Sequence, residues 1–196
     1  MPPRVLDPSP GERVLDLCSA PGAKATQLAA LTGGEGTIVC VERNPSRADG
    51  LRRTLQRMHV PNATVRIADA ADAGAGGEPP FDRVLVDPPC SGLGTLQSRP
   101  DLRWRTSPAR IADASALQAR ILEAAGAATA PGGTLVYSVC TISRVESEQI
   151  VNRFLAHHDD FAPDPFAGAD PGTSNLRLMP HLHRTDGFFV ARLIRR

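Results

Sequence analysis

Two cysteines lie where a thiol could do chemistry, because one ends a predicted buried strand and the other lies in the loop after another. Cys140 ends the strand segment Tyr137-Ser-Val-Cys, and Cys90 ends the loop segment Asp87-Pro-Pro-Cys. The two prolines before Cys90 stiffen the loop, and a reacting group has to be held rigidly. A thiolate is a soft nucleophile, suited to adding to an electrophilic ring carbon. These segments therefore predict nucleophilic chemistry by a thiol.

Further polar side chains are expected at the same edge of the fold. A polar or reactive residue ends each of five predicted strands, and these residues are Cys18, Glu42, Asp69, Asp87 and Cys140. Parallel strands bring their carboxyl ends to one edge of a sheet, where open α/β sheets bind their ligands. Aspartate is also common at ordinary strand-to-loop turns, so no single position is decisive. Taken together, the five positions favour a site.

The turn after the first predicted strand contains a single glycine, Gly22. Glu42 follows roughly 20 residues later at the end of the second strand, where an acidic residue can accept hydrogen bonds from ribose hydroxyls. A dinucleotide pyrophosphate usually requires more glycines than one, as in the G-x-G-x-x-G pattern. One glycine suits a ligand that has an adenosine but no phosphate, and S-adenosylmethionine fits that description.

The elements that would position these residues alternate along the chain. Strands are predicted at residues 13–18, 37–42, 65–69, 81–87, 134–140 and 187–194, and helices at 23–31, 45–58, 108–130 and 144–154. This alternation indicates an open α/β sheet that is mostly parallel and has helices on both faces. We expect a single domain at 13–196, a linker or truncated end at 1–12, a loop at 74–80 and irregular chain at 159–175.

Composition narrows the class of protein. The formal net charge is +1, so any surface for a polyanion has to be local. No two of the four cysteines form a C-x-x-C pair, so we expect neither a metal site nor a disulfide scaffold. No apolar run approaches the roughly 20 residues of a membrane span, and the start Met-Pro-Pro-Arg lacks the apolar core of a signal peptide. We expect a monomeric cytoplasmic protein.

A local basic surface is predicted after Cys90. Trp104 lies among arginines there, namely Arg99, Arg103, Arg105 and Arg110. Arginine interleaved with an aromatic residue suits phosphate contact and base stacking. The alternative is a solvated loop whose tryptophan packs inward, and the sequence leaves both interpretations open.

Several motifs resemble one family in their order and spacing, over residues 13–194. They are Leu15-Asp-Leu-Cys-Ser-Ala-Pro-Gly-Ala-Lys24, Asp87-Pro-Pro-Cys-Ser-Gly92, Arg99-Pro-Asp-Leu-Arg-Trp104, Tyr137-Ser-Val-Cys-Thr141 and Asp186-Gly-Phe-Phe189. The chain resembles the Sun/Fmu family of RNA (cytosine-5)-methyltransferases. The resemblance implies the Rossmann-like class I methyltransferase fold, with a mostly parallel seven-stranded sheet and an antiparallel C-terminal strand.

The resemblance also implies roles for individual residues. The S-adenosylmethionine site would comprise Cys18, Ser19, Ala20, Pro21, Gly22, Ala23 and Lys24, together with Glu42, Asp69 and Asp87. Cys140 would attack the cytosine, and Cys90 would assist release of the methylated product. We expect Asp87 to hydrogen-bond the cytosine ring, and Lys24 to position Asp87 or lower a thiol pKa. The substrate would be single-stranded or looped RNA, with ribosomal RNA favoured over transfer RNA.

The chain departs from the family pattern at two motifs and leaves other functions open. Gly22-Ala-Lys-Ala stands where the family usually has Gly-Gly-Lys-Thr, and Val139 stands where it often has threonine. Family members usually carry an extra N-terminal RNA-binding part, which this sequence does not include. The alternatives are a DNA cytosine-5 methyltransferase with Cys90 as nucleophile, a nicotinamide oxidoreductase, and a catalytically silent RNA-binding module that retains the fold.

Overall fold

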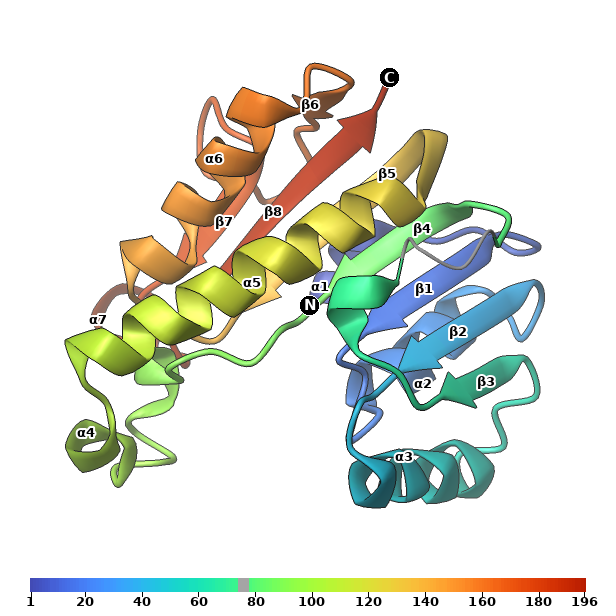
Figure 1. Ribbon diagram of the computed structural model, residues 1–196, viewed down its shortest axis with the longest axis horizontal. Coiled ribbons are helices and arrows are strands. Elements are labelled where there is room, and N and C mark those ends of the chain that lie inside the picture. The colour runs from blue at the N-terminus through green and yellow to red at the C-terminus, as the bar shows by residue number, and fades with distance from the viewer. Residues whose placement is uncertain (74–77) are drawn as a thin grey trace.

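A twisted sheet of eight strands forms the centre of the protein (Figure 1). The computed structural model describes residues 1–73 and 78–196. The strands are β1 (Arg13–Leu17), β2 (Thr37–Val41), β3 (Ala63–Arg66), β4 (Phe81–Val86), β5 (Thr129–Val139), β6 (Phe161–Pro163), β7 (Asn175–Leu178) and β8 (Phe188–Arg195). Seven of them follow one path in the order β3-β2-β1-β4-β5-β8-β6, and β7 pairs with β8 beside that path.

The first five strands are parallel, and β8 runs against its neighbours. The predicted mostly parallel α/β sheet with an antiparallel C-terminal strand is confirmed. The sequence did not predict β6 or β7, which have three and four residues. Both pair antiparallel with the longer strand β8. This pairing holds them in the sheet, whereas their own sequences are too short to show a strand pattern.

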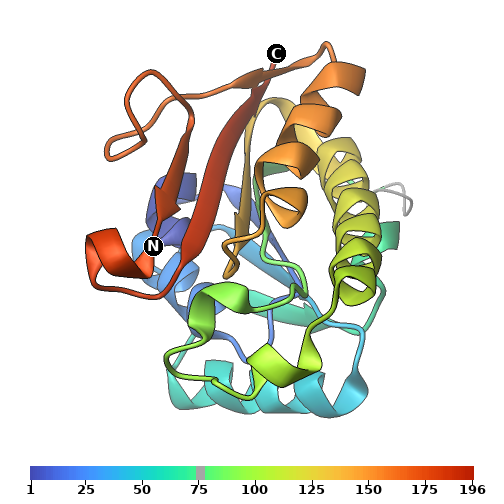
Figure 2. The same cartoon turned by 90° about the vertical axis from the view of Figure 1, so that its left-hand side faces the viewer.

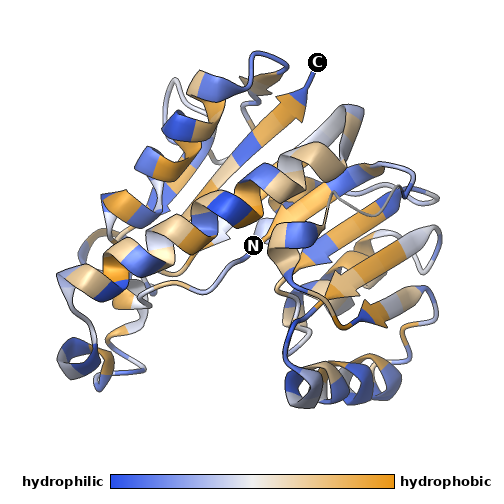
Figure 3. Ribbon diagram, viewed as in Figure 1, coloured by the Kyte–Doolittle hydropathy of each residue, from blue (hydrophilic) through white to orange (hydrophobic). Residues whose placement is uncertain are grey.

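Helices cover both faces of the sheet. The longer ones are α2 (Ala23–Leu31), α3 (Pro45–Arg57), α5 (Pro108–Ala128) and α6 (Glu148–His157), and the shorter ones are α1 (Pro2–Leu6), α4 (Leu102–Arg105) and α7 (Pro180–His183). Apolar side chains of α5 and α6 pack on one face of the sheet, and those of α1, α2 and α3 pack on the other. Figure 2 shows α5 and α6 on one side of the sheet and α1 and α2 on the opposite side. Hydrophobic residues concentrate on the central strands, whereas α3 is largely hydrophilic (Figure 3).

Local sequence signals account for where the helices begin. The Ser107 side chain accepts a hydrogen bond from the Arg110 N–H at 3.3 Å, and Pro108 follows at the first helical position of α5. Asn44 and Pro45 begin α3 in the same way. The helix predicted over residues 144–154 is instead a 3₁₀ turn, η3 (Arg144–Glu146), followed by α6. The loop predicted over residues 74–80 lies in part outside the described residues.

The start of the chain differs from the predicted linker. Residues 2–6 form α1, whose Val5 and Leu6 side chains are buried. The helix contacts α2, β4, β5 and β8. Five residues are too few to show a helical period, and the two prolines suit a first helical turn. Burial against the sheet therefore makes this segment a packed helix. Within the described residues, no helix combines the length and the apolar character of a membrane span.

Candidate active site

The residues that end the parallel strands meet at one edge of the sheet. Leu17 of β1 pairs with Val41 of β2 and with Val86 of β4, and Val86 pairs with Tyr137 of β5. Cys18, Glu42 and Asp87 directly follow β1, β2 and β4, and Cys140 directly follows β5. Asp69 lies three residues beyond the end of β3, where its side chain accepts a hydrogen bond from the Ala71 N–H and begins the turn η1 (Ala70–Asp72).

The two predicted thiols are in contact. Cys90 Sγ lies 3.3 Å from Cys140 Sγ, and both side chains are half-buried. A hydrogen bond from the Cys90 thiol lowers the pKa of Cys140, although burial opposes this change, and the positive charge of Lys24 lowers it further. The same hydrogen bond, burial and the negative charge of Glu146 raise the pKa of Cys90. Cys140 is therefore the thiol that ionises first.

A half-buried ion pair lies beside the thiols. Lys24 Nζ is 2.5 Å from Asp87 Oδ2, and the Ser138 hydroxyl donates to Asp87 Oδ1 at 3.1 Å. Burial acts to lower the pKa of Lys24, but the charge and hydrogen bond of Asp87 outweigh it and raise that pKa. Lys24 is therefore a permanent cation that holds Asp87 and faces Cys140.

The sequence analysis missed Glu146, which joins the two loops that carry the thiols. Its fully buried carboxylate accepts hydrogen bonds from the N–H and hydroxyl of Ser91, at 2.7 and 2.5 Å, and from the Thr141 hydroxyl at 3.1 Å. Ser91 directly follows Cys90, and Thr141 directly follows Cys140. The Gln118 side chain donates to the same carboxylate at 3.2 Å, and the Tyr137 hydroxyl donates to the Glu146 carbonyl at 2.7 Å. A glutamate inside a predicted helix gave no signal of this burial.

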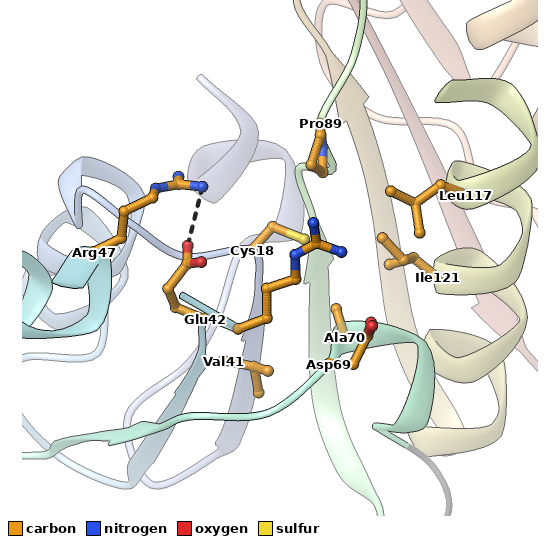
Figure 4. A pocket seen from close by; sticks show the side chains of 10 residues that line it. Cys18, Val41, Glu42, Arg47, Asp69, Ala70, Pro89, Leu117 and Ile121 are labelled. Carbon is orange, nitrogen blue, oxygen red and sulfur yellow. Dashed lines mark ion pairs between the residues drawn. The ribbon is translucent and has the colours of Figure 1, made fainter. Parts of the chain in front are cut away.

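A pocket lies between the strand ends and α5, and Pro89, the neighbour of Cys90 in the chain, lines it (Figure 4). Cys18, Glu42 and Asp69 line it, and its apolar walls come from Val41, Pro89, Leu117 and Ile121. Glu42 is 3% exposed. Its carboxylate accepts a hydrogen bond from the Asn44 N–H at 2.9 Å and pairs with Arg47 at 3.4 Å.

The turn between β1 and α2 carries further predicted site residues. Gly22 has φ 109°, and a Cβ on it would lie 2.8 Å from Leu51 Cδ1, so this position requires glycine. Ser19 is buried, and its hydroxyl donates to Asp16 Oδ2 at 2.6 Å. Burial raises the pKa of Asp16 to about 7, against the effect of the Ser19 hydrogen bond and Lys24.

The predicted site residues therefore fall into groups. Cys18, Glu42 and Asp69 share the pocket, and Lys24, Asp87, Cys90 and Cys140 form the adjoining cluster. The remaining predicted residues of the turn lie away from the pocket: Ala20 and Pro21 line a hollow against α3, and Ala23 lines one beside β7 and β8. No group of three or more His, Cys, Asp or Glu in the described part of the chain is arranged to hold a metal ion.

Comparison with known proteins identifies the family. A family model described as 16S rRNA methyltransferase RsmB/F matches residues 3–194. The chain belongs to this family. Among RsmB/F relatives, it is 42% identical to a probable ribosomal RNA small subunit methyltransferase B of Synechocystis, over 97% of this chain and 44% of the relative. It is 38% identical to ribosomal RNA small subunit methyltransferase F of Serratia proteamaculans, over 92% of this chain and 40% of the relative.

Solved structures support the same assignment. NSun6 from Pyrococcus horikoshii, solved with SFG, superposes with a TM-score of 0.89 at 30% identity, over 98% of this chain and 50% of that one. A methyltransferase homologue from the same organism gives a TM-score of 0.87 at 30% identity, over all of this chain and 65% of that one. The chain spans less than half the length of the two curated RsmB/F relatives named above.

Proposed function

We propose that this chain is the catalytic part of an S-adenosylmethionine-dependent RNA (cytosine-5)-methyltransferase that acts through a covalent cysteine–cytosine intermediate. The observation that carries the proposal is the pair of thiols 3.3 Å apart, next to the Lys24–Asp87 ion pair and a pocket with a buried carboxylate. Family membership supports methyl transfer to ribosomal RNA, because the matching family model and both named relatives carry that description.

The pocket residues fit S-adenosylmethionine. The nearly buried Glu42 retains lone pairs for ribose hydroxyls beyond its bonds to Asn44 and Arg47. The apolar side chains of Leu117 and Ile121 form a wall suited to an adenine ring. SFG, an analogue of S-adenosylmethionine, occupies the Pyrococcus NSun6 structure. When bound, S-adenosylmethionine supplies an electrophilic methyl group.

Cys140 is the nucleophile in this proposal. Carbon-5 of cytosine is a poor nucleophile, but addition of the Cys140 thiolate at carbon-6 converts carbon-5 into an enamine carbon that can accept a methyl group. The lowered pKa of Cys140 supplies the thiolate. A base then takes the carbon-5 proton, the carbon–sulfur bond breaks, and the thiolate leaves as the carbon-5–carbon-6 double bond re-forms. A hydrogen bond from Cys90 eases that departure by stabilising the charge on Cys140 Sγ.

Asp87 and Lys24 orient the base. Asp87 accepts hydrogen bonds from Lys24 and Ser138, which hold its carboxylate beside the thiols. A carboxylate in this place can accept a hydrogen bond from the amino group of cytosine, and from ring nitrogen 3 once that nitrogen is protonated, which stabilises the protonated ring as the thiolate adds. The base has to be unstacked first, which favours single-stranded or looped ribosomal RNA. We also propose that the described fold, α1 included, is a single catalytic domain, monomeric and cytoplasmic.

Methyl transfer tests the proposal. The chain is incubated with small-subunit ribosomal RNA and S-adenosylmethionine, and 5-methylcytosine is measured by mass spectrometry of digested RNA. Cys140→Ala should abolish product while S-adenosylmethionine still binds, as followed by calorimetry. Cys90→Ala should accumulate a protein–RNA adduct that survives denaturation, because release is slowed. Cys40→Ala is the matched control, since Cys40 is buried on the other face of the sheet.

The outcomes separate the alternatives. Methylation by Cys140→Ala but not by Cys90→Ala would reverse the two roles. RNA binding without any 5-methylcytosine would support the silent RNA-binding module instead. Methylation of DNA but not of RNA would identify a DNA cytosine-5 methyltransferase instead.

A further inference from the structure

A cleft of about 210 Å³ opens beside Cys90, on the side formed by α4 and the start of α5. Its lining comprises Cys90, Ser91, Arg99, Leu102, Arg105, Thr106, Arg110 and Ala114. None of the described residues that line this cleft is acidic. The cleft therefore connects a positively charged surface directly to a reacting thiol.

Contacts around the cleft hold its arginines in place. Arg110 donates to the Arg105 carbonyl at 2.6 Å, which ties the end of α4 to the start of α5. Arg105 also pairs with Asp101 at 3.3 Å, a partner outside the cleft lining. The 21-residue helix α5 begins here, and its amino end adds partial positive charge. Three guanidinium groups and a helix start in one place favour an anionic ligand.

Trp104 lies between two arginines on α4 and is 84% exposed. The sequence left open whether this tryptophan packs inward, and the structure shows that it does not. An exposed indole ring is costly to leave in water and offers a flat surface on which an unpaired base can stack. The pairing of exposed aromatic and arginine side chains is typical of surfaces that bind single-stranded nucleic acid.

We propose that this arginine cleft binds phosphates of the RNA strand next to the target cytidine, and that Trp104 stacks on a neighbouring base. The proposal rests on the function proposed above and adds the path of the RNA strand. Arg99, Arg105 and Arg110 contact phosphates, so they set affinity rather than the chemistry at Cys140.

The test measures RNA binding apart from methylation. A fluorescein-labelled single-stranded oligoribonucleotide is titrated with the chain at several potassium chloride concentrations, and anisotropy gives the affinity. The triple variant Arg99→Ala, Arg105→Ala and Arg110→Ala should bind more weakly, and the slope of log affinity against log salt should fall by roughly 2, at roughly 0.7 for each lost phosphate contact. Arg103→Ala is the matched control, because Arg103 is exposed on α4 and does not line the cleft.

Further measurements keep this proposal distinct from the proposed function. Trp104→Ala should weaken binding without changing the salt slope, and alkylation of Cys140 should stay unchanged in all these variants. Unchanged affinity and slope in the triple variant would overturn the cleft proposal even if the protein methylates RNA. RNA binding that depends on these arginines, without methylation, would support the cleft proposal and contradict the proposed methyltransferase activity.

A second inference comes independently from the contacts of Glu146. We infer that Glu146 is a positioning residue that keeps Cys90 protonated, so that Cys140 is the cysteine that ionises. Its carboxylate binds the N–H and hydroxyl of Ser91, one residue from Cys90, and no cation contacts this carboxylate among the described residues.

The other charged groups that face Cys140 are of both signs. Lys24, on α2, favours the Cys140 thiolate, whereas the charge of Asp87 opposes it more strongly. Cys90 faces the buried hydroxyl of Tyr137 and the carboxylate of Glu146. The hydrogen bond between the thiols and the negative charge of Glu146 beside Cys90 together favour the thiolate on Cys140.

Alkylation by iodoacetamide tests the role of Glu146. Under single-hit conditions over a range of pH, mass spectrometry should find the label mainly on Cys140 in the unaltered protein. Glu146→Gln keeps the shape of the side chain and removes its charge, so the share of label on Cys90 should rise several-fold at neutral pH. Glu123→Gln, on the exposed outer surface of α5, is the control. An unchanged distribution in folded Glu146→Gln would overturn the inference and leave Glu146 a purely structural residue.

Discussion

At the scale of single residues, side chains of the same type ionise differently in this site because their surroundings differ. Cys90 and Cys140 touch, yet their surroundings shift the pKa values of the two thiols in opposite directions. In the same way, Asp87 is paired with a cation, whereas Asp16 is fully buried and its Oδ1 has no hydrogen-bond partner among the described residues. Environment, rather than residue type, therefore decides which group is charged at neutral pH.

Asp16 gives a testable dependence of stability on pH. Burial raises the pKa of Asp16 to about 7 in the folded protein, whereas an unfolded aspartate titrates near 3.9. Between these values, unfolding releases a proton from Asp16, so its contribution to stability is full below about pH 4 and is lost as pH rises through about 7. Relative to Asp16→Asn, the unaltered protein should lose about 2 kcal/mol of unfolding free energy between pH 5 and 7.

Urea unfolding of both proteins across this range measures the effect. The quantity of interest is how the difference in unfolding free energy between the two proteins changes with pH. Any pH-independent effect of the asparagine on stability therefore cancels. Parallel curves for the two proteins would show that Asp16 is ionised in the folded state.

At the scale of elements, short turns position the reacting groups. The turn η2 (Leu93–Thr95) follows Cys90, and the Gly94 N–H donates to the Cys140 carbonyl at 3.1 Å. The Gly187 N–H donates to the Gly94 carbonyl at 2.8 Å, and a Cβ on Gly187 would lie 2.9 Å from Gly94 Cα. This close approach explains the glycine of the Asp186-Gly-Phe-Phe motif: it ties the loop after Cys90 to the start of β8.

The β1–α2 turn gives a prediction at this scale. Gly22→Ala should cost about 1–3 kcal/mol of unfolding free energy, because alanine rarely adopts a φ of 109° and its Cβ would press on Leu51. The turn should then shift, and S-adenosylmethionine should bind more weakly in calorimetry. Gly33→Ala is the matched control: Gly33 also has positive φ, but a Cβ there meets nothing within 4 Å. A Gly22→Ala protein that binds the methyl donor normally would show that the turn tolerates the change.

At the scale of the whole molecule, two cores on opposite faces hold the sheet edge rigid. Residues of β1, β4 and β5 alternate between the two cores, so Leu17 and Val86 pack towards α5 and α6, while Val14 and Leu85 pack towards α1, α2 and α3. The proposed methyl-donor pocket lies on the α5 side, and α5 also begins at the arginine cleft. One helix therefore borders both the cofactor pocket and the proposed path of the RNA.

Much of this architecture follows from local sequence pattern. The apolar runs at residues 13–17, 37–41 and 81–86 are strands, the helices α2 and α3 begin and end close to the predicted residues, and Ser107-Pro108 begins α5. Such elements could be predicted because β-branched runs, caps and glycine turns act within a few residues of chain. α1, β6 and β7 could not, because each is short and is held by partners that are distant in sequence.

The sequence by itself determined which residues stand at the strand ends, since strand order and turn chemistry bring Cys18, Glu42, Asp87 and Cys140 to one edge. Only the tertiary structure decided how those residues act on one another. The 3.3 Å contact of the thiols, the Lys24–Asp87 pair and the burial of Glu146 each join segments of chain from separate loops. Charge and ionisation depend on such distances and on exclusion of water, and neither is encoded in any single stretch of residues.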